Sequence, residues 1–382
     1  MKTTVIRNIA VLLVVAFVCI FTGRIYLQQQ QPDELYTGNP NITSVIKLSD
    51  YNENLKGTVN DVDIYVFDSG VPGGKALIYG GTHTNEVGSM LNAVTYLENV
   101  KCEAGTIYVM VHANNSGYTH TQPLRAQIGS MDFTLTDGST RSFHVGTRIS
   151  NPIHQWPDPN YHFNSSGRRL IHDELAEIRN LNRNHPGEKN GYLTEATCYA
   201  IWNFIVTEGI DMIFDGHEAG AESTNLVNTL VIHERAMTLG TTAVTNCLIN
   251  NLPFKVEISG ITSYGLSHRG IGDNTNALCT LFETCNPAMG SLHEKMTEKL
   301  FKEGISQNYY TLHQNGVYGN AFVFDETGWP IEKRTAYQMN MSMELLNTFS
   351  ELYPDKPIKV SGLPDAQYML ANGLEATLKS LT

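Results

Sequence analysis

The sequence predicts an α/β fold with a mixed, mostly parallel central sheet that has helices on both faces, preceded by an apolar N-terminal helix. Short β-branched and apolar runs alternate with segments that repeat apolar residues at helical spacing. Several runs end directly in polar residues, as buried strands of α/β sheets do at the edge that carries their chemistry. Hydrophobic residues make up 41% of the 382 residues and charged residues 17%, so a large core is available.

The N-terminus is predicted to be a signal anchor or signal peptide, over residues 1–24. Lys2 and Arg7 precede an uninterrupted apolar or small run at 9–21, and Arg24 follows it. A charged region followed by an apolar one is typical of export signals. No clear cleavage site follows, which favours an uncleaved anchor. We therefore expect an extracytoplasmic protein that is membrane-anchored through this segment or secreted.

Two further segments complete the predicted organisation: a polar linker that leads into the domain at 25–55, and a single domain at 56–382. The formal net charge of −12 argues against a nucleic-acid partner, which would need a basic surface. The six cysteines contain no Cys-x-x-Cys pair, which argues against a structural zinc ribbon. Cys279 and Cys285 either form a disulfide or remain buried free thiols.

Along the chain, the apolar pattern predicts the elements in order. Strands are expected at 62–66, 76–79, 106–112, 210–214 and 277–282. Helices are expected at 87–97, 195–208, 236–250, 291–310 and 337–349. Residues 119–170 show little periodicity, and we expect them to form an ordered loop region beside the functional site.

The stretch at residues 80–86 carries the clearest chemistry. It follows the strand at 76–79, and a glycine pair makes the turn. His83 and Glu86 are three residues apart, so their side chains can converge on one ion. Imidazole and carboxylate are zinc ligands, and His217, which follows the strand at 210–214, supplies a third.

Five motifs at strand ends or turns, in the same order, resemble the zinc carboxypeptidase superfamily, which includes the succinylglutamate desuccinylase/aspartoacylase branch. Residues 81–86 resemble its first two zinc ligands, and residues 215–218 its third-ligand motif. Residues 115–118 and 181–187 resemble its Asn-Pro-Asp-Gly-Tyr and Asp-Leu-Asn-Arg-Asn-Phe-Pro-Gly segments. Residues 280–283 resemble the strand that carries its catalytic glutamate.

Two positions depart from the family pattern, because Asn180 stands where aspartate is usual and His185 where phenylalanine is usual. The resemblance implies one Zn²⁺ per chain, held by His83, Glu86 and His217 with a position left for water. It also implies that Glu283 takes the proton of that water and passes it to the leaving amine.

The remaining roles concern the substrate. The resemblance implies that Asn182 and Arg183 bind a substrate carboxylate and that Tyr264 faces the substrate. An arginine should also face the developing oxyanion. We assign that role to Arg179, and the other candidates are Arg168, Arg169 and, less favoured, Arg125.

Further residues are considered around this set. His268 and Arg269 are candidates for the specificity pocket. Asp215 is expected to orient the imidazole of His217. Glu218 should point the other way on an extended segment and is not taken as a ligand.

The expected function is hydrolysis of an amide bond next to a free carboxylate, in a C-terminal peptide bond or a small N-acyl amino acid. The export signal suits a peptide substrate better. Two alternatives remain open: a catalytically inactive zinc-containing module that binds a peptide or ligand, and a metal-free enzyme that uses two carboxylates on glycans or peptides.

Overall fold

A computed structural model describes residues 2–122, 128–167, 169–171, 177–317 and 324–381. Its centre is an eight-stranded sheet in the order β1-β2-β5-β3-β10-β13-β11-β12. The strands are β1 (Ser44–Lys47), β2 (Asp63–Asp68), β3 (Lys75–Tyr79), β5 (Thr106–Met110), β10 (Met212–Ala219), β11 (Thr229–Ile232), β12 (Lys255–Ile258) and β13 (Leu278–Cys285). The four central strands, β5-β3-β10-β13, run parallel to one another, and antiparallel pairings flank them on both sides.

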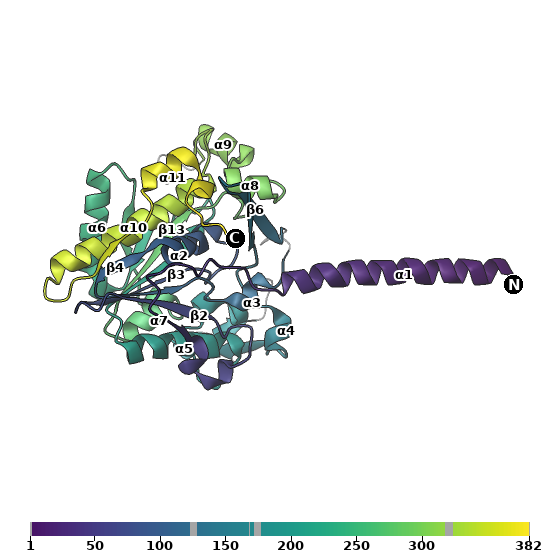
Figure 1. The fold of residues 1–382 in the computed structure, drawn as a ribbon, viewed down its shortest axis with the longest axis horizontal. Coiled ribbons are helices and arrows are strands. Elements are labelled where there is room, and N and C mark those ends of the chain that lie inside the picture. The colour runs from purple at the N-terminus through teal and green to yellow at the C-terminus, as the bar shows by residue number, and fades with distance from the viewer. Residues whose placement is uncertain (1, 123–127, 168, 172–176, 318–323, 382) are drawn as a thin grey trace.

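Helices cover both faces of this sheet, as the sequence predicted (Figure 1). One face carries α2 (Val87–Asn99), α6 (Met237–Ile249) and α10 (Ile331–Leu352), and the other carries α5 (Leu193–Glu208) and α7 (Ser267–Asn274). Side chains on β3 alternate between the two cores: Ala76 and Ile78 pack in one, and Leu77 and Tyr79 in the other. This alternation follows from the two-residue period of a strand, and it decides which face each functional side chain reaches.

The remaining elements are short and lie around the sheet. The helices are α3 (Asn115–Tyr118), α4 (Pro152–Gln155), α8 (Glu298–Glu303), α9 (Gln307–Gln314) and α11 (Ala366–Asn372). The strands form three pairs: β4 (Lys101–Ala104) with β14 (Lys359–Ser361), β6 (Ser130–Thr134) with β7 (Thr140–His144), and β8 (Tyr161–Phe163) with β9 (Arg169–Ile171).

Four expectations need correction. Strands β10 and β13 extend past residues 214 and 282, so His217 and Glu283 lie within strands rather than after them. Residues 119–170 contain β6, β7, the helical turn α4, β8 and the start of β9 instead of loop alone. Residues 291–297 are not helical, so the expected helix at 291–310 becomes α8 and α9. Part of the expected linker at 25–55 forms β1, which pairs with β2.

The N-terminal helix α1 (Lys2–Gln29) projects from the body of the molecule (Figure 1). It is long and apolar enough to cross a membrane by length and composition, and none of its apolar window is buried against the protein. At a rise of 1.5 Å per residue its length is about 42 Å, compared with about 30 Å for the hydrocarbon core of a bilayer.

Candidate metal centre

Three side chains from distant parts of the chain meet at the carboxyl end of β3. His83 Nδ1 lies 2.7 Å from Glu86 Oε1, and His217 Nδ1 lies 2.9 Å from Glu86 Oε2. One donor atom from each of these three residues lies within 4.8 Å of the others, and all three side chains are buried. The sequence prediction that His83, Glu86 and His217 converge therefore matches the geometry.

Strand register brings Glu283 to the same place. His217 on β10 is paired with Glu283 on β13, and neighbouring strands lie about 4.8 Å apart. Asp215 and His217 project to the α5/α7 side of the sheet, as does Glu283. Phe214 and Phe282, which directly precede Asp215 and Glu283, point to the opposite face of the sheet and pack in the other core.

Glu218 confirms this alternation, since it points to the α10 side. Its carboxylate pairs with Arg334 at 3.1 and 3.2 Å and accepts a hydrogen bond from Asn286 Nδ2 at 2.9 Å. Both members of the Glu218–Arg334 pair have side chains 0% exposed. Removing one partner of such a pair costs about 3–5 kcal/mol, so we expect Glu218 to have a structural role. Its side chain points away from that of His217, as the sequence predicted.

Each imidazole turns one nitrogen toward Glu86 and the other toward an oxygen outside the cluster. His83 Nε2 lies 3.0 Å from Asn180 Oδ1, and His217 Nε2 lies 3.0 Å from Asp215 Oδ2. Such outer contacts fix the ring orientation of metal-binding histidines. The sequence predicted the Asp215 contact. Asn180 was noted as a departure from the family pattern, but its contact with His83 was not foreseen.

Asp215 is itself held by two hydroxyl groups. Thr82 Oγ1 donates to Asp215 Oδ1 at 2.9 Å, and Ser267 Oγ donates to Asp215 Oδ2 at 2.5 Å. Burial would raise the pKa of Asp215, but the charge of His217 and these hydrogen bonds outweigh it, so the pKa is lowered. The group is therefore a fixed anion behind His217.

The charges within the cluster shift the pKa values of its members in opposite directions. Burial would raise the pKa of Glu86, but the charges of His83 and His217 lower it well below its usual value. Burial would lower the pKa of His217, but Asp215 and Glu86 raise it well above its usual value. His217 Nδ1 also lacks an aligned hydrogen-bond partner among the described residues, although Glu86 is near. Two imidazoles and a carboxylate that converge on one point form a ligand set that suits a divalent metal ion.

The environment of Glu283 differs from that of Glu86. Burial raises the pKa of Glu283 to about 8, and the charge of Glu86 adds to this effect, while His217 and Arg148 oppose it. Glu283 Oε2 has no hydrogen-bond partner among the described residues. A carboxyl group whose pKa lies near neutrality can accept and donate a proton, and a cation beside it would lower the pKa again.

A cavity of about 670 Å³ opens in front of these residues. Its wall contains His83, Glu86 and Glu283, together with two arginines, Arg148 and Arg183. Both arginines sit near a single carboxylate that is itself outside the wall: Arg148 Nη2 lies 3.5 Å from Glu177 Oε1, and Arg183 Nε lies 3.0 Å from Glu177 Oε2.

Arg148 is a cavity residue that the sequence did not point to. It lies in the segment that was expected to be irregular, where no motif or periodicity points to it. Its position depends on tertiary contacts, because Thr84 donates from its backbone N–H and its hydroxyl to Thr147 O at 3.2 and 2.7 Å. The loop that carries His83 therefore holds the residue preceding Arg148.

The arginines proposed for the oxyanion lie elsewhere. Arg179 is outside the cavity wall, where its Nε lies 2.7 Å from Asp158 Oδ2 and its Nη1 donates to Ser150 O. Arg169 is exposed, with its guanidinium 4.9 Å from the ring centre of Tyr161. Arg125 and Arg168 lie outside the described residues.

The remaining substrate candidates divide between wall and periphery. Asn182 and His268 line the cavity; Asn182 Oδ1 accepts from the backbone N–H of Ser267 at 2.7 Å. Tyr264 is 42% exposed and is not part of the cavity wall, although its neighbour Ser263 is. Arg269 is also outside the wall and forms ion pairs on the surface.

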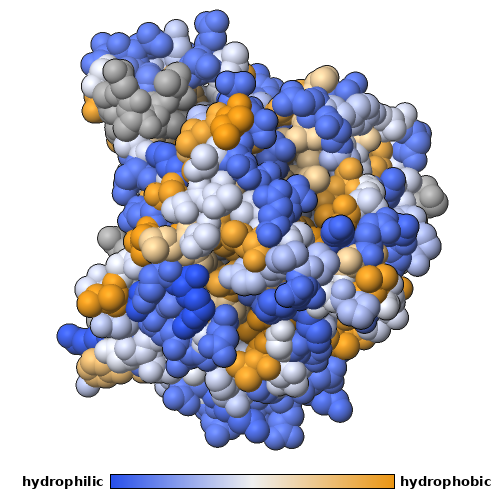
Figure 2. Space-filling view, turned by 90° about the vertical axis from the view of Figure 1, so that its left-hand side faces the viewer, coloured by the Kyte–Doolittle hydropathy of each residue, from blue (hydrophilic) through white to orange (hydrophobic). Residues whose placement is uncertain are grey.

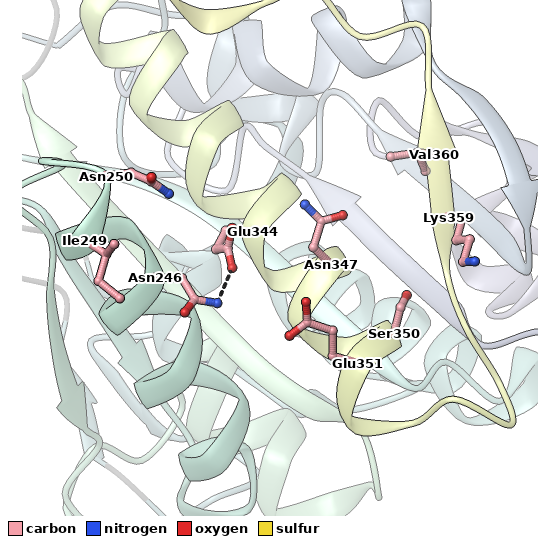
Figure 3. Close-up of a pocket in the computed structure, with 9 residues that line it drawn as sticks. All are labelled: Asn246, Ile249, Asn250, Glu344, Asn347, Ser350, Glu351, Lys359 and Val360. Carbon is pink, nitrogen blue, oxygen red and sulfur yellow. Dashed lines mark hydrogen bonds between the residues drawn. The ribbon is translucent and has the colours of Figure 1, made fainter.

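A second hollow, of about 610 Å³, lies between α6, α10 and β14 (Figure 3). Its wall contains amides and two carboxylates, and Asn246 Nδ2 donates to Glu344 Oε1 at 2.8 Å. No histidine or cysteine is among the described residues that line it, in contrast with the cavity at His83.

Known proteins were compared with the chain at the level of sequence and of structure. No protein-family model matches the sequence, and no curated protein matches it either. A metallo-carboxypeptidase from Burkholderia cenocepacia is similar in structure at 15% identity, over 86% of this chain and 68% of its own, with a TM-score of 0.46. A succinylglutamate desuccinylase from a Silicibacter species is similar at 16% identity, over 60% of this chain and 55% of its own, with a TM-score of 0.36.

A third similar structure is a D,L-carboxypeptidase from Helicobacter pylori in its mDAP-bound form. It is 10% identical to this chain, the similarity covers 78% of this chain and 56% of its own length, and the TM-score is 0.43. The chain thus spans from 55% to 68% of the length of these three proteins. Two of these three proteins are carboxypeptidases and one is a desuccinylase.

Proposed function

We propose that the protein is a zinc-dependent hydrolase that cleaves an amide bond next to a free carboxylate. The observation that carries this proposal is the meeting of His83, Glu86 and His217 at one point, with Glu283 beside His217 in strand register. The two nitrogens and the carboxylate suit zinc, and three protein ligands leave one position open for catalysis.

We assign each residue around the centre its own role in the reaction. When bound, a zinc ion would polarise the substrate carbonyl and activate a water molecule. Glu283 takes the proton of the attacking water and passes it to the leaving amine. Arg148, in the wall of the same cavity, stabilises the negative charge that develops on the carbonyl oxygen, in place of Arg179. Asn182 and Arg183 bind the substrate carboxylate.

A row of residues that line the cavity favours one kind of substrate side chain. Strand register places Leu281, Val231 and Glu257 in one row across β13, β11 and β12, and all three line the cavity. The row spans two strand spacings, about 10 Å, and passes from apolar residues to a carboxylate. A side chain with an apolar stem and a terminal positive charge fits this row, which favours a C-terminal peptide residue over a small N-acyl amino acid.

The helix α1 supports an extracytoplasmic location. Its apolar length is unburied, and basic residues flank it, as in a signal anchor. In this proposal the hydrolase domain remains attached to the membrane through α1.

The deciding experiment is an assay of the full chain in detergent, with zinc and then with a chelator. The substrates are N-blocked dipeptides ending in lysine, leucine or glutamate, and N-acyl amino acids. We expect chelator-reversible hydrolysis that is fastest on the lysine-ending peptide, and Glu257→Gln should reduce that preference. Bound zinc without turnover on any substrate would instead support an inactive binding module, and turnover that is insensitive to the chelator would contradict a metal mechanism.

A further inference from the structure

The end of α1 is fixed to the body of the protein by side-chain hydrogen bonds. Gln29 Nε2 donates to Tyr118 O at 2.8 Å, and Gln30 Nε2 donates to Thr119 O at 2.6 Å. Both acceptors belong to α3 or follow it directly. The direction in which α1 leaves the body is therefore set by contacts with α3.

A buried carboxylate strengthens this attachment three residues later. Asp33 accepts from His112 Nε2 at 3.0 Å and from His144 Nδ1 at 2.6 Å, and its side chain is 2% exposed. Burial would raise the pKa of Asp33, but the hydrogen bonds from His112 and His144 outweigh it and lower the pKa to about 2. The group is thus an anion at neutral pH, and it links the chain after α1 to β7 and to the segment that follows β5.

The short helix α4 lies against the same part of α3. Asn151 Nδ2 donates to Thr119 Oγ1 at 2.9 Å, and Ser116 Oγ lies 2.9 Å from His154 Nδ1. Figure 1 shows α4 at the edge of the body, beside the point where α1 leaves it. Any bilayer that α1 crosses would therefore face this edge.

From α4 at this edge onward to β8, the chain exposes large apolar side chains. We call the following four residues the aromatic rim: Ile153, Trp156, Tyr161 and Phe163, which are 56%, 76%, 54% and 61% exposed. Between them, Gln155 is buried and bonds to Thr194, so along α4 a polar side chain points inward while apolar ones point outward. This reverses the usual arrangement at a surface in contact with water.

The aromatic rim lies within one short stretch of chain, residues 153–163. The rings of Tyr161 and Phe163 are 6.3 Å apart, and five residues of chain limit the distance between the Trp156 and Tyr161 Cα atoms to about 18 Å. The guanidinium of Arg169 lies over the Tyr161 ring, which places a positive charge among the aromatic groups. By contrast, apolar residues are scattered among hydrophilic ones on the face opposite to α1 (Figure 2).

We propose that the aromatic rim binds the headgroup region of the bilayer that α1 crosses, so that the domain rests on the membrane surface instead of standing away from it. The proposal rests on the insertion of α1 proposed above. Tryptophan and tyrosine favour the membrane–water interface because each has an apolar ring and a polar group. Arg169 is placed to meet lipid phosphates.

The rim is connected to the substrate side of the cavity. The side chain of Asn164, directly after β8, donates to the backbone oxygen of Arg183, and His162 Nε2 lies 3.2 Å from Asn184 Oδ1. Contact of the rim with lipid would thus hold the turn that carries Arg183 at a fixed distance from the membrane. The enzyme would then act on substrates that lie close to the bilayer surface.

The proposal can be tested by tryptophan fluorescence on the full chain in phosphatidylcholine vesicles. The three tryptophans are Trp156, Trp202 and Trp329, and none lies in α1. Lipids brominated near the headgroup quench only nearby rings. We expect them to quench a substantial part of the wild-type emission, and we expect that part to be absent in Trp156→Phe and retained in Trp202→Phe.

Equal fractional quenching in the wild type and in Trp156→Phe would overturn the proposal. Failure of the chain to float with the vesicles would show that α1 does not insert, and the rim proposal would fail with it. Amide hydrolysis by the same samples, assayed in detergent, tests the proposed function separately, because Trp156 is outside the catalytic machinery. Trp156→Phe should therefore keep the wild-type rate.

Discussion

Two clusters of histidine and carboxylate groups in this molecule have the composition of a metal site, and they differ in what lies between the donors. In the first, His83, Glu86 and His217 are buried and face one another. In the second, His233 meets Glu234 and Asp273 at the surface. There Arg269 lies 2.7 Å from a carboxylate oxygen of each acidic residue.

The difference lies in the source of the positive charge. In the surface cluster a guanidinium already neutralises the two carboxylates, and water screens what remains. In the buried cluster, no guanidinium pairs with Glu86 among the described residues, and His83 and His217 themselves lower the pKa of Glu86. A buried carboxylate needs a compensating cation, so of these two clusters the first should take up a metal ion. The following predictions test this contrast, beginning with the largest expected effect.

Replacing a ligand in the buried cluster should abolish both metal binding and activity. For Glu86→Gln we expect loss of stoichiometric zinc and a fall in activity of at least about 100-fold, since the metal-dependent chemistry is lost. Metal content by mass spectrometry and the hydrolysis rate would be measured on the same sample, with circular dichroism to verify folding. The matched control is Asp273→Asn in the surface cluster, which should keep the zinc. If Asp273→Asn lost its zinc and Glu86→Gln kept it, the surface cluster and not the buried one would be the metal site.

Replacing Glu283 should separate metal binding from turnover. In Glu283→Gln we expect kcat to fall by about 10² to 10⁴, because the group that transfers the proton is gone while the three ligands remain. Zinc content should stay at one per chain. Glu351→Gln, in the hollow of Figure 3, is the control and should leave kcat unchanged. A near-normal kcat in Glu283→Gln would exclude its role in proton transfer.

Replacing the outer partner of a ligand should give an intermediate effect. Asp215→Asn removes the anion that lies 3.0 Å from His217 Nε2, and zinc affinity should fall by about 10- to 100-fold. Competition with a chelator of known affinity measures the change. Glu234→Gln, which alters the surface cluster in a comparable way, should leave the affinity at the wild-type value. Equal affinities in both variants would mean that Asp215 does not support the ligand.

Removing the guanidinium from the surface cluster should have the smallest effect. In Arg269→Gln we expect a loss of less than about 1 kcal/mol in the free energy of unfolding, because its partner Glu234 is largely exposed. Urea denaturation measures this value. Zinc should remain at one per chain. Uptake of a second zinc ion would show that Arg269 alone prevents the surface cluster from binding a metal ion.

Local sequence patterns were sufficient for several parts of the site. The spacing of His83 and Glu86 after a glycine turn, and the alternation that sends Glu218 away from His217, follow from the periods of strand and turn. The strand at 76–79 and the helix at 195–208 also match β3 and α5 closely. Such features depend on residues close together in the chain, so the sequence carries them directly.

Other features depend on contacts between distant segments. Arg148 reaches the cavity because Thr84 holds Thr147, and Asn180 meets His83 across 97 positions of sequence. Arg179 carries the same charge as Arg148, but Asp158 and Ser150 hold it outside the cavity wall. Nothing in the local sequence distinguishes these two arginines.

The sequence by itself determined the four central strands of the sheet, four of the helices that cover it, the face on which His217 lies, and the residues expected to bind a metal ion. Only the tertiary structure decided which arginine lines the cavity, that β10 and β13 continue through His217 and Glu283, and how α1 joins the body. The physical reason is range. Backbone periodicity and side-chain alternation act over a few residues, whereas the position of a guanidinium depends on which distant hydrogen-bond and charge partners the fold brings to it.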